Sequence, residues 1–454
     1  MKKINGHIIF VSILLVLSLF YLNGIILHKN SIPLNIHYIN DLTFVSYNVK
    51  EALKNNELPL WTPYFYSGHP LMAIPENYMF DLNFLLIYLF RDIYLAMNFS
   101  LIFYFFLAGL GMYILCNSIA ENKKAAFISA IVYMFNGFVH SFIIDAHINL
   151  LEGYALIPFI FLFVYKALRS KNWIFYSVLA GIFFALQILS GSMIFFFYTA
   201  LIIFFYMAFN LISKKFMNAL AKSFFIGAAI AMVSLSLASI KLLPALEFTK
   251  MSSRAANVSF NEFLGQPVSF KDIASLAVTN IGYSGFSAAI GIVSFIFLIC
   301  GLRQYKKRIV MFSLIIIIFS LLFSTGTFVA SAMYKVPGFE KLRHVERSLV
   351  LFAFAGSVLA GHGFALLCER LKKFSLYLKH ENMFFIGIIF LVLLELLFLQ
   401  RVPMPSEIIG PENIKVLQYI GDDNSLFRTM NLGLKDIIGH AGYNYYAQKG
   451  ISEA

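Results

Sequence analysis

Residues 193–215 have the sequence MIFFFYTALIIFFYMAFNLISKK, in which an apolar run over 193–212 is followed by Lys214 and Lys215. A helix rises about 1.5 Å per residue, so a run of about twenty residues crosses the hydrocarbon core of a bilayer, about 30 Å thick. Lysines placed directly after such a run are typical of cytoplasmic loops. The segment is therefore predicted to be a transmembrane helix that ends in the cytoplasm.

The composition extends this prediction to the whole chain. Of the 454 residues, 60% are hydrophobic and only 13% are charged, and the mean hydropathy is +0.78. Soluble domains carry roughly 25% charged residues. No soluble core could bury so much apolar surface, so we expect an all-α, polytopic protein surrounded by a lipid bilayer.

Further segments share the length and apolarity of 193–212, which gives about eleven predicted transmembrane helices. With the N-terminus in the cytoplasm, the basic runs fall in every second loop, as the positive-inside rule requires. This placement accounts for the net charge of +12 without a nucleic-acid partner, and none is expected. The other predicted spans are 8–27, 94–117, 125–143, 151–168, 173–190, 222–243, 287–302, 309–328, 347–367 and 383–400.

The loops on the opposite, extracytoplasmic side hold most of the polar side chains. The first of them, residues 28–93, is expected to be structured, with a helix over 41–53 and then a stretch rich in proline and aromatic residues. Residues 82–90 are apolar but too short to span, so we place them at the interface or in a re-entrant segment. Residues 1–402 form the predicted transmembrane domain, and 403–454 are expected to begin an extracytoplasmic domain that continues beyond the end of the sequence.

Candidate functional residues begin in the first outer loop. Asp41 is either a charge favoured by the dipole of the helix it starts or a general base that deprotonates an acceptor hydroxyl. Trp61, Tyr64 and His69 lie among prolines, and Glu76 follows. These residues form either an interfacial aromatic belt or a rigid platform for a sugar ring or a lipid headgroup.

The second outer loop contributes Asp145 and His147, with Glu152 at the start of the next span. A carboxylate and an imidazole two residues apart are either part of a solvated loop or a pair that binds a metal or relays a proton. No cofactor is required by this pattern, and a divalent metal is the one cofactor it could accommodate. The three cysteines have no metal-ligand spacing and imply no disulfide framework.

Arginines on the outer side run against the positive-inside rule and so need a reason. Arg343 and Arg347 are four residues apart, and we expect them on one face of a helix that enters the membrane. Their forked donors suit the oxygens of a phosphate, and the alternative is an ion-pair network with Glu340 and Glu346. Arg254 is a further outer cation, open to the same two interpretations.

These segments together resemble the YfhO-like family of bacterial membrane proteins, within the GT-C-type glycosyltransferases. The matching segments occur in the family's order, although Thr62 replaces the usual asparagine and Leu342 the usual phenylalanine. They are Asp41, LPLWTPY at 58–64, GHPL at 68–71, HIN at 147–149, IPF at 157–159, GSMIFFFY at 191–198, LLPALE at 242–247, SR at 253–254, LRHVERSL at 342–349 and AGHG at 360–363.

The resemblance implies a GT-C-like helix bundle in a bacterial plasma membrane that transfers a sugar from a polyprenyl-phosphate-linked donor to an acceptor outside the membrane. Attack from the face opposite the donor phosphate is expected to invert the anomeric centre. The acceptor it implies is a teichoic acid, such as lipoteichoic acid, or another cell-envelope polymer. It also implies that an acidic residue of the first outer loop is the general base, which corresponds to Asp41 here. Arg343 and Arg347 are then expected to hold the donor phosphate.

Two other classes of function compete with this one. A flippase or transporter of lipid-linked sugars should place polar residues near the middle of its spans. Here the central stretches are mostly apolar, and Gln187, Lys241 and Glu395 are the main interruptions. A non-catalytic scaffold would use the same outer loops for assembly alone.

Overall fold

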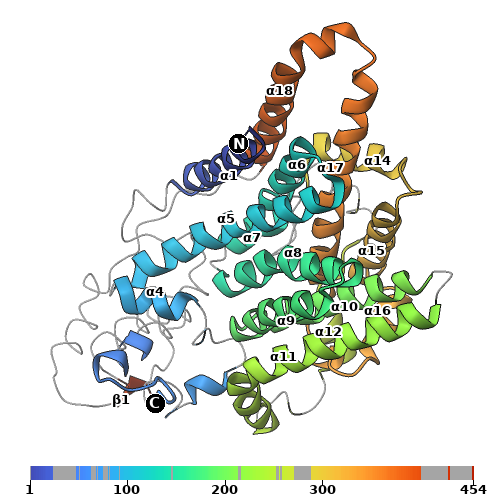
Figure 1. The fold of residues 1–454 in the computed structure, drawn as a ribbon. Coiled ribbons are helices and arrows are strands. Elements are labelled where there is room, and N and C mark those ends of the chain that lie inside the picture. Colours follow the sequence, from blue (N-terminus) through green and yellow to red (C-terminus); the bar gives the residue numbers. More distant parts are fainter. Residues whose placement is uncertain are drawn as a thin grey trace.

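The computed structural model places the chain in a bundle of helices (Figure 1). It describes residues 2–23, 48–50, 52–62, 68, 70–74, 80, 82–90, 93–144, 147–212, 216–251, 255, 258–269, 273, 288–399, 428–429 and 452–453. The described helices are α1 (Lys2–Tyr21), α4 (Leu82–Phe90), α5 (Ile93–Ala120), α6 (Lys123–Met134), α7 (Gly137–Ile144), α8 (Ile148–Arg169), α9 (Trp173–Leu189), α10 (Met193–Leu211), α11 (Phe216–Met251), α12 (Phe260–Leu264), α14 (Ile292–Leu302), α15 (Arg308–Ser324), α16 (Phe328–Tyr334), α17 (Leu349–Leu371) and α18 (Ser375–Leu399). Short 3-10 helices are η1 (Leu71–Ala73), η3 (Phe339–Lys341) and η4 (Val345–Ser348), and two short strands, β1 (Arg428–Thr429) and β2 (Ser452–Glu453), pair in parallel.

The predicted all-α membrane fold is confirmed. Within the described residues, 6 helices are long and apolar enough to cross a membrane, or 8 if each of two bent pairs counts as one span. The bent pairs are α6 with α7, at 46°, and α15 with α16, at 86°. Three shorter apolar helices, α1, α9 and α14, occupy the remaining predicted segments. Each predicted span therefore coincides with an apolar helix or a bent pair.

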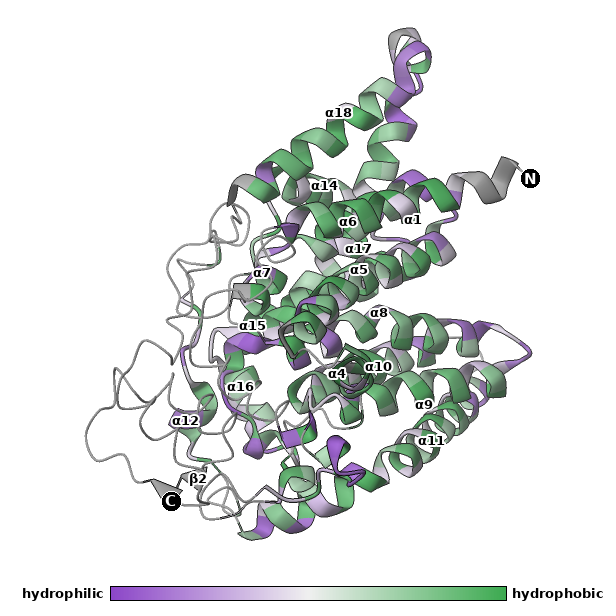
Figure 2. Ribbon diagram, turned by 90° about the vertical axis from the view of Figure 1, so that its left-hand side faces the viewer, coloured by the Kyte–Doolittle hydropathy of each residue, from purple (hydrophilic) through white to green (hydrophobic). Residues whose placement is uncertain are grey.

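The distribution of hydropathy gives the bundle two distinct ends. Figure 2 shows apolar residues along the lengths of the helices and hydrophilic ones at the turns between them. One end carries Lys123, Arg169, Arg308 and Lys372, and we call it the basic end. The opposite end, where α8, α10 and α17 begin, is called the outer end, in line with the predicted orientation.

The centre of the bundle is formed by α6, α8 and α17. Most of α17 and α8 is buried, whereas only 17% of the central stretch of α18 and 28% of that of α11 are buried. Glycines let α17 approach its neighbours closely, because a Cβ atom on Gly363 would lie 1.7 Å from the carbonyl oxygen of Phe297 on α14. The peripheral helices thus keep broad apolar faces for lipid.

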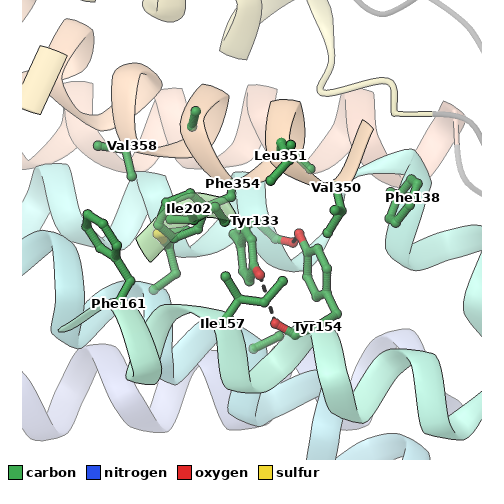
Figure 3. Close-up of a cluster of buried hydrophobic side chains, with 14 of the residues drawn as sticks. Tyr133, Phe138, Tyr154, Ile157, Phe161, Ile202, Val350, Leu351, Phe354 and Val358 are labelled. Carbon is green, nitrogen blue, oxygen red and sulfur yellow. Dashed lines mark hydrogen bonds between the residues drawn. The ribbon is translucent and has the colours of Figure 1, made fainter. Parts of the chain in front are cut away.

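Two backbone carbonyls inside the bundle lack their usual helical hydrogen-bond donor, one because of the break between α6 and α7 and one because of a proline in α8. The N–H of Gly137 donates to the carbonyl of Ala289 (2.8 Å) instead of continuing the ladder to Tyr133, and Pro158 has no N–H to offer Tyr154. The hydroxyls of Tyr133 and Tyr154 bind these two carbonyls, as Figure 3 shows for Tyr133. Such satisfaction is required where no water is available.

The described parts of the first outer loop pack together and against the bundle, in line with the structured loop predicted from the sequence. Val49 and Leu71 are buried in a small cluster with Leu86 and Ile87 of α4, and η1 lies against α11. The short apolar segment predicted over 82–90 is α4. Of the helix predicted over 41–53, residues 48–50 and 52–53 are helical, and 41–47 and 51 lie outside the described residues.

Two carboxylates attach the peripheral helix α18 to the bundle. Near the basic end, Lys124 donates to Glu381 (2.8 Å). At the other end, Glu395 accepts from the backbone N–H groups of Ile292 and of Val293 (3.0 Å to the latter) at the start of α14. The sequence suggested that Glu395 interrupts the middle of a span, whereas it satisfies the free N–H groups of a neighbouring helix terminus.

Candidate functional site

Ionisable side chains from three separate segments lie within electrostatic reach of one another at the outer end of the bundle. His147 precedes α8, Tyr198 lies one turn and a half into α10, and Glu346 and Arg347 lie on η4. Arg347 is close enough to act electrostatically on both His147 and Tyr198, and Glu346 also acts on Tyr198. We refer to these four residues as the Arg347 cluster.

The segment that carries Arg347 does not have the predicted conformation. Arg343 lies in irregular backbone before η4, and His344 between the two arginines is left-handed, with φ of 70°. The expectation that Arg343 and Arg347 share one face of a helix is therefore wrong. The turn is stabilised from outside, because His344 packs on Gly265, where a Cβ atom would lie 2.6 Å from its Nδ1.

The break separates the two arginines into different surroundings. Arg343 donates to Glu262 of α12 (3.3 Å), and both side chains are about half exposed. Glu346 is buried and forms a hydrogen bond with His344 (2.8 Å). Arg343 and Glu346 thus each have a partner outside the predicted network, and Arg347 is the arginine that acts electrostatically on His147 and Tyr198.

His147 is a buried residue and not part of a solvated loop. Only 7% of it is exposed, and its backbone N–H donates to the carbonyl of Phe142 (2.8 Å). Burial, followed by the positive charge of Arg347, lowers the pKa of His147 to about 3. The imidazole is therefore neutral at physiological pH. A cation beside it also makes His147 a poor ligand for a divalent metal.

Glu152 lies deeper along α8, beside the turn that joins α9 to α10. It is 3% exposed, and its neighbour Gly153 packs on Ser192 so closely that a Cβ atom would lie 2.1 Å from the Ser192 Oγ. Gln187 donates from Nε2 to the carbonyl of Gly153 (2.7 Å). A buried carboxylate is thereby held inside the bundle, close to its outer end.

Lys241 approaches the same turn from α11. Its ammonium group is buried and donates to the carbonyl of Leu189 (2.8 Å), the last residue of α9. A cation at the C-terminal end of a helix is favoured by the helix dipole. Two of the polar interruptions seen in the sequence, Gln187 and Lys241, therefore form bonds to backbone carbonyls between helices.

Trp61 is the one aromatic residue of the predicted platform that can be placed. It is 59% exposed, and its indole packs over Gly68, where a Cβ atom would lie 2.5 Å from the ring. Six predicted site residues lie outside the described part of the chain: Asp41, Tyr64, His69, Glu76, Asp145 and Arg254. Their roles stay predictions.

Several polar residues, two of them buried histidines, were not predicted from the sequence. His140 of α7 forms a hydrogen bond with the hydroxyl of Tyr21 on α1 (2.8 Å), and His362 is buried within α17. Glu262 was also missed, although the pattern Ser259-x-x-Glu262 marks a helix start, and the capping box is present. Across the described residues, no three His, Cys, Asp or Glu side chains are grouped as metal ligands would be.

A family model matches residues 80–400, and its description is "6-pyruvoyl-tetrahydropterin synthase related domain; membrane protein". The match covers more than half of the chain. The chain belongs to this family. The part that matches this synthase-related membrane domain runs from the start of α4 to the end of α18, so it includes the whole Arg347 cluster. No curated protein matches the chain in sequence.

Solved structures show which fold this synthase-related membrane domain adopts. The crystal structure of the oligosaccharyltransferase of Archaeoglobus fulgidus, in complex with zinc and sulfate, has a TM-score of 0.58 at 15% identity, covering 98% of this chain and 62% of that one. A structure of the oligosaccharyltransferase AglB from the same organism, with an inhibitory peptide and a dolichol-phosphate, has a TM-score of 0.48 at 16% identity, covering 100% and 56%. The chain thus spans less than two thirds of either protein. The first likeness confirms the predicted GT-C-like fold.

Proposed function

We propose that the chain is a membrane glycosyltransferase of the GT-C kind, related to the YfhO-like proteins. It moves a sugar from a polyprenyl-phosphate carrier to an envelope polymer, such as a teichoic acid, on the outer side. The oligosaccharyltransferase with the same fold supports glycosyl transfer as the class of reaction. The observation that carries the proposal is the Arg347 cluster, in which a guanidinium group lies with a buried, neutral imidazole, a phenol and the buried carboxyl group of Glu346 at the outer end.

In this proposal Arg347 binds the phosphate of the donor. A guanidinium group offers forked donors that match phosphate oxygens and stays charged when partly buried. Tyr198 and the neutral His147 supply further hydrogen-bonding groups without a competing charge. Arg343 has a smaller role, because Glu262 already engages it.

The proposed reaction needs a general base as well as a group that binds the phosphate. The acceptor hydroxyl attacks the anomeric carbon from the face opposite the phosphate, and the bond from that carbon to the phosphate oxygen breaks. Asp41 takes the hydroxyl proton as general base, and Arg347 compensates the charge of the departing polyprenyl phosphate. The configuration at the anomeric carbon is inverted. No metal step is included, since the described member of the Asp145 and His147 pair lies beside a cation.

The competing transporter hypothesis is favoured by one observation, the polar side chains buried within the spans. Asn136, His140, Gln187 and Lys241 are all buried. Three of them, however, bond to backbone carbonyls where helices bend or end, which is what a rigid bundle needs in lipid. This use of the buried polar groups supports an enzyme.

Transfer and translocation are separated by presenting the donor on one side only. Labelled polyprenyl-phosphate sugars are supplied to the outer face of proteoliposomes together with an envelope acceptor fraction. We expect labelled polymer to form without movement of the donor to the lumen, and Asp41→Asn to abolish it. Glu57→Gln, an exposed carboxylate of the same loop, is the matched control. Translocation without labelled polymer would favour the flippase, and full activity of Asp41→Asn would exclude Asp41 as the base.

A further inference from the structure

The basic end of the bundle has one sector with no acidic residues. The turns over 169–173, 212–222 and 303–308 contain Lys and Arg but no Asp or Glu. The opposite sector differs, because Glu121, Glu369 and Glu381 lie among its cations and Lys124 is paired with Glu381. The positive charge on the first sector therefore has no acidic counterpart in its own turns.

Within this sector, Arg169 is held in a fixed position at the end of α8. Its guanidinium group stacks on the ring of Tyr165, 3.7 Å from the centroid, and donates to the hydroxyl of Tyr206 on α10 (2.5 Å). Tyr206 is buried, whereas Arg169 is exposed. Stacking on one ring and bonding to a second phenol orient the remaining N–H donors before any ligand arrives.

Two more cations approach the same helix end. Lys222 of α11 donates to the carbonyls of Leu168 (2.9 Å) and Ser170 (3.3 Å), on either side of Arg169. Arg308, the first residue of α15, donates to the carbonyl of Ile212 (2.8 Å) and lies close enough to act on the Tyr206 hydroxyl. Neither arginine pairs with a carboxylate among the described residues.

The surface beside these cations is apolar and exposed. On α10 and α11, Phe204 is 64% exposed, Phe224 is 68% exposed and Phe225 is 57% exposed, and Ile212 follows α10 with 73% exposed. A ligand for this place needs an anionic head for the cations and long apolar chains for the adjacent helix surface. A phospholipid has both, and a soluble anion has only the first.

We propose that Arg169, Lys222 and Arg308 form a binding site for the phosphate of an anionic phospholipid in the leaflet at the basic end. The two arginines hold the phosphate oxygens in a charge-assisted fork. The acyl chains lie along α10 and α11. The site is independent of the outer-end chemistry, since it lies at the opposite ends of α8 and α10.

Trp173 makes this site measurable. The chain has 2 tryptophans, and Trp173 starts α9 with its ring 6.5 Å from that of Phe225. In a Trp61→Phe background it is the sole tryptophan, and lipids with brominated acyl chains quench its fluorescence. We expect brominated phosphatidylglycerol to quench at about tenfold lower mole fraction than brominated phosphatidylcholine, as several cations near an anionic headgroup imply. Equal quenching by the two lipids would overturn the proposal.

Paired variants distinguish a site formed by these particular arginines from general attraction by the positive charge of the surface. Arg169→Gln with Arg308→Gln should reduce the preference for phosphatidylglycerol to about twofold, whereas Arg303→Gln with Lys306→Gln removes the same charge from exposed neighbours and should retain most of it. Equal losses would overturn the assignment.

Two further measurements test the role of the guanidinium groups and the identity of the ligand. Arg169→Lys with Arg308→Lys keeps the charge, but its preference for phosphatidylglycerol should still fall about threefold, because lysine lacks the forked donors of arginine. An unchanged preference would contradict binding of the phosphate by the two guanidinium groups. The preference is also measured with inorganic phosphate and with chloride at the same ionic strength. If phosphate abolished the preference and chloride did not, the site would bind a soluble anion and the lipid proposal would be overturned.

Discussion

The side chains of Tyr133 and Tyr154 each bind the backbone carbonyl of the other residue. The Tyr133 hydroxyl donates to the Tyr154 carbonyl (2.9 Å), the Tyr154 hydroxyl donates to the Tyr133 carbonyl (2.8 Å), and the rings stack with centroids 4.1 Å apart. Both carbonyls lack their helical partner, because of Pro158 and the break before Gly137. The pair joins α6 to α8 and so fixes the helix whose first residues border the Arg347 cluster.

Removing the hydroxyl of Tyr133 should destabilise the bundle more than removing that of Tyr154. In Tyr133→Phe the Tyr154 carbonyl loses its side-chain donor, with an expected cost of about 1–3 kcal/mol. In Tyr154→Phe the Tyr133 carbonyl keeps the amide of Asn136 (2.6 Å). That amide loses the Tyr154 hydroxyl as an acceptor but keeps the Tyr133 and Val132 carbonyls, so the cost is smaller. Unfolding titrations in detergent measure both. Tyr176→Phe, on a half-buried tyrosine of α9, is the control, and a cost as large there would contradict this account.

Acid should weaken the protein through His147. Because its pKa is about 3 in the folded protein and about 6.5 when unfolded, the unfolded state takes up the proton first. The stability is therefore fully present above about pH 6.5 and falls as the pH drops, by up to about 2 kcal/mol at about pH 5. His147→Gln should lack this part of the loss, as unfolding at the two pH values would show. The exposed His380→Gln should behave like the parent protein, and an identical pH dependence of His147→Gln and the parent would refute the prediction.

Glu395 should contribute more to the attachment of α18 than Glu381 does. Glu395→Ala removes the carboxyl group that accepts from the N–H groups of both Ile292 and Val293, with an expected cost of about 1–3 kcal/mol. Glu381→Ala breaks a partly exposed pair with Lys124, worth at most about 1 kcal/mol. Hydrogen exchange at residues 292–293 gives the direct measurement. Faster exchange there in Glu381→Ala than in Glu395→Ala would reverse the assignment.

Much of the fold followed from the sequence, because length and apolarity are what a bilayer selects. The predicted span over 193–212 is α10, and the short segment over 82–90 is α4. The bend after Met134 was missed, although Asn136-Gly137 stands inside an apolar run, and it moves His140 into the bundle. The sequence cannot show which carbonyls such a bend releases, because their partners come from distant helices.

The site was harder to predict than the fold for a related reason. The pattern of Arg343 and Arg347 fits a helix, and only packing between His344 and Gly265, far apart in sequence, imposes the left-handed turn that separates them. The burial of His147 within electrostatic reach of Arg347 likewise depends on segments that are far apart in the sequence. Local spacing identified the residue types, and tertiary contacts decided which of them meet.

The separation of the two arginines also gives the most direct test of the proposed chemistry. Sugar transfer from a polyprenyl-phosphate donor is measured in proteoliposomes for Arg347→Gln and Arg343→Gln, with equal amounts of folded protein. We expect Arg347→Gln to lower kcat/KM by about a hundredfold or more, the size of losing a charge-assisted contact to the leaving phosphate. Arg343→Gln should stay within about threefold, as an exposed pair is weak. Wild-type transfer by Arg347→Gln, with activity lost instead in Arg343→Gln, would contradict the account.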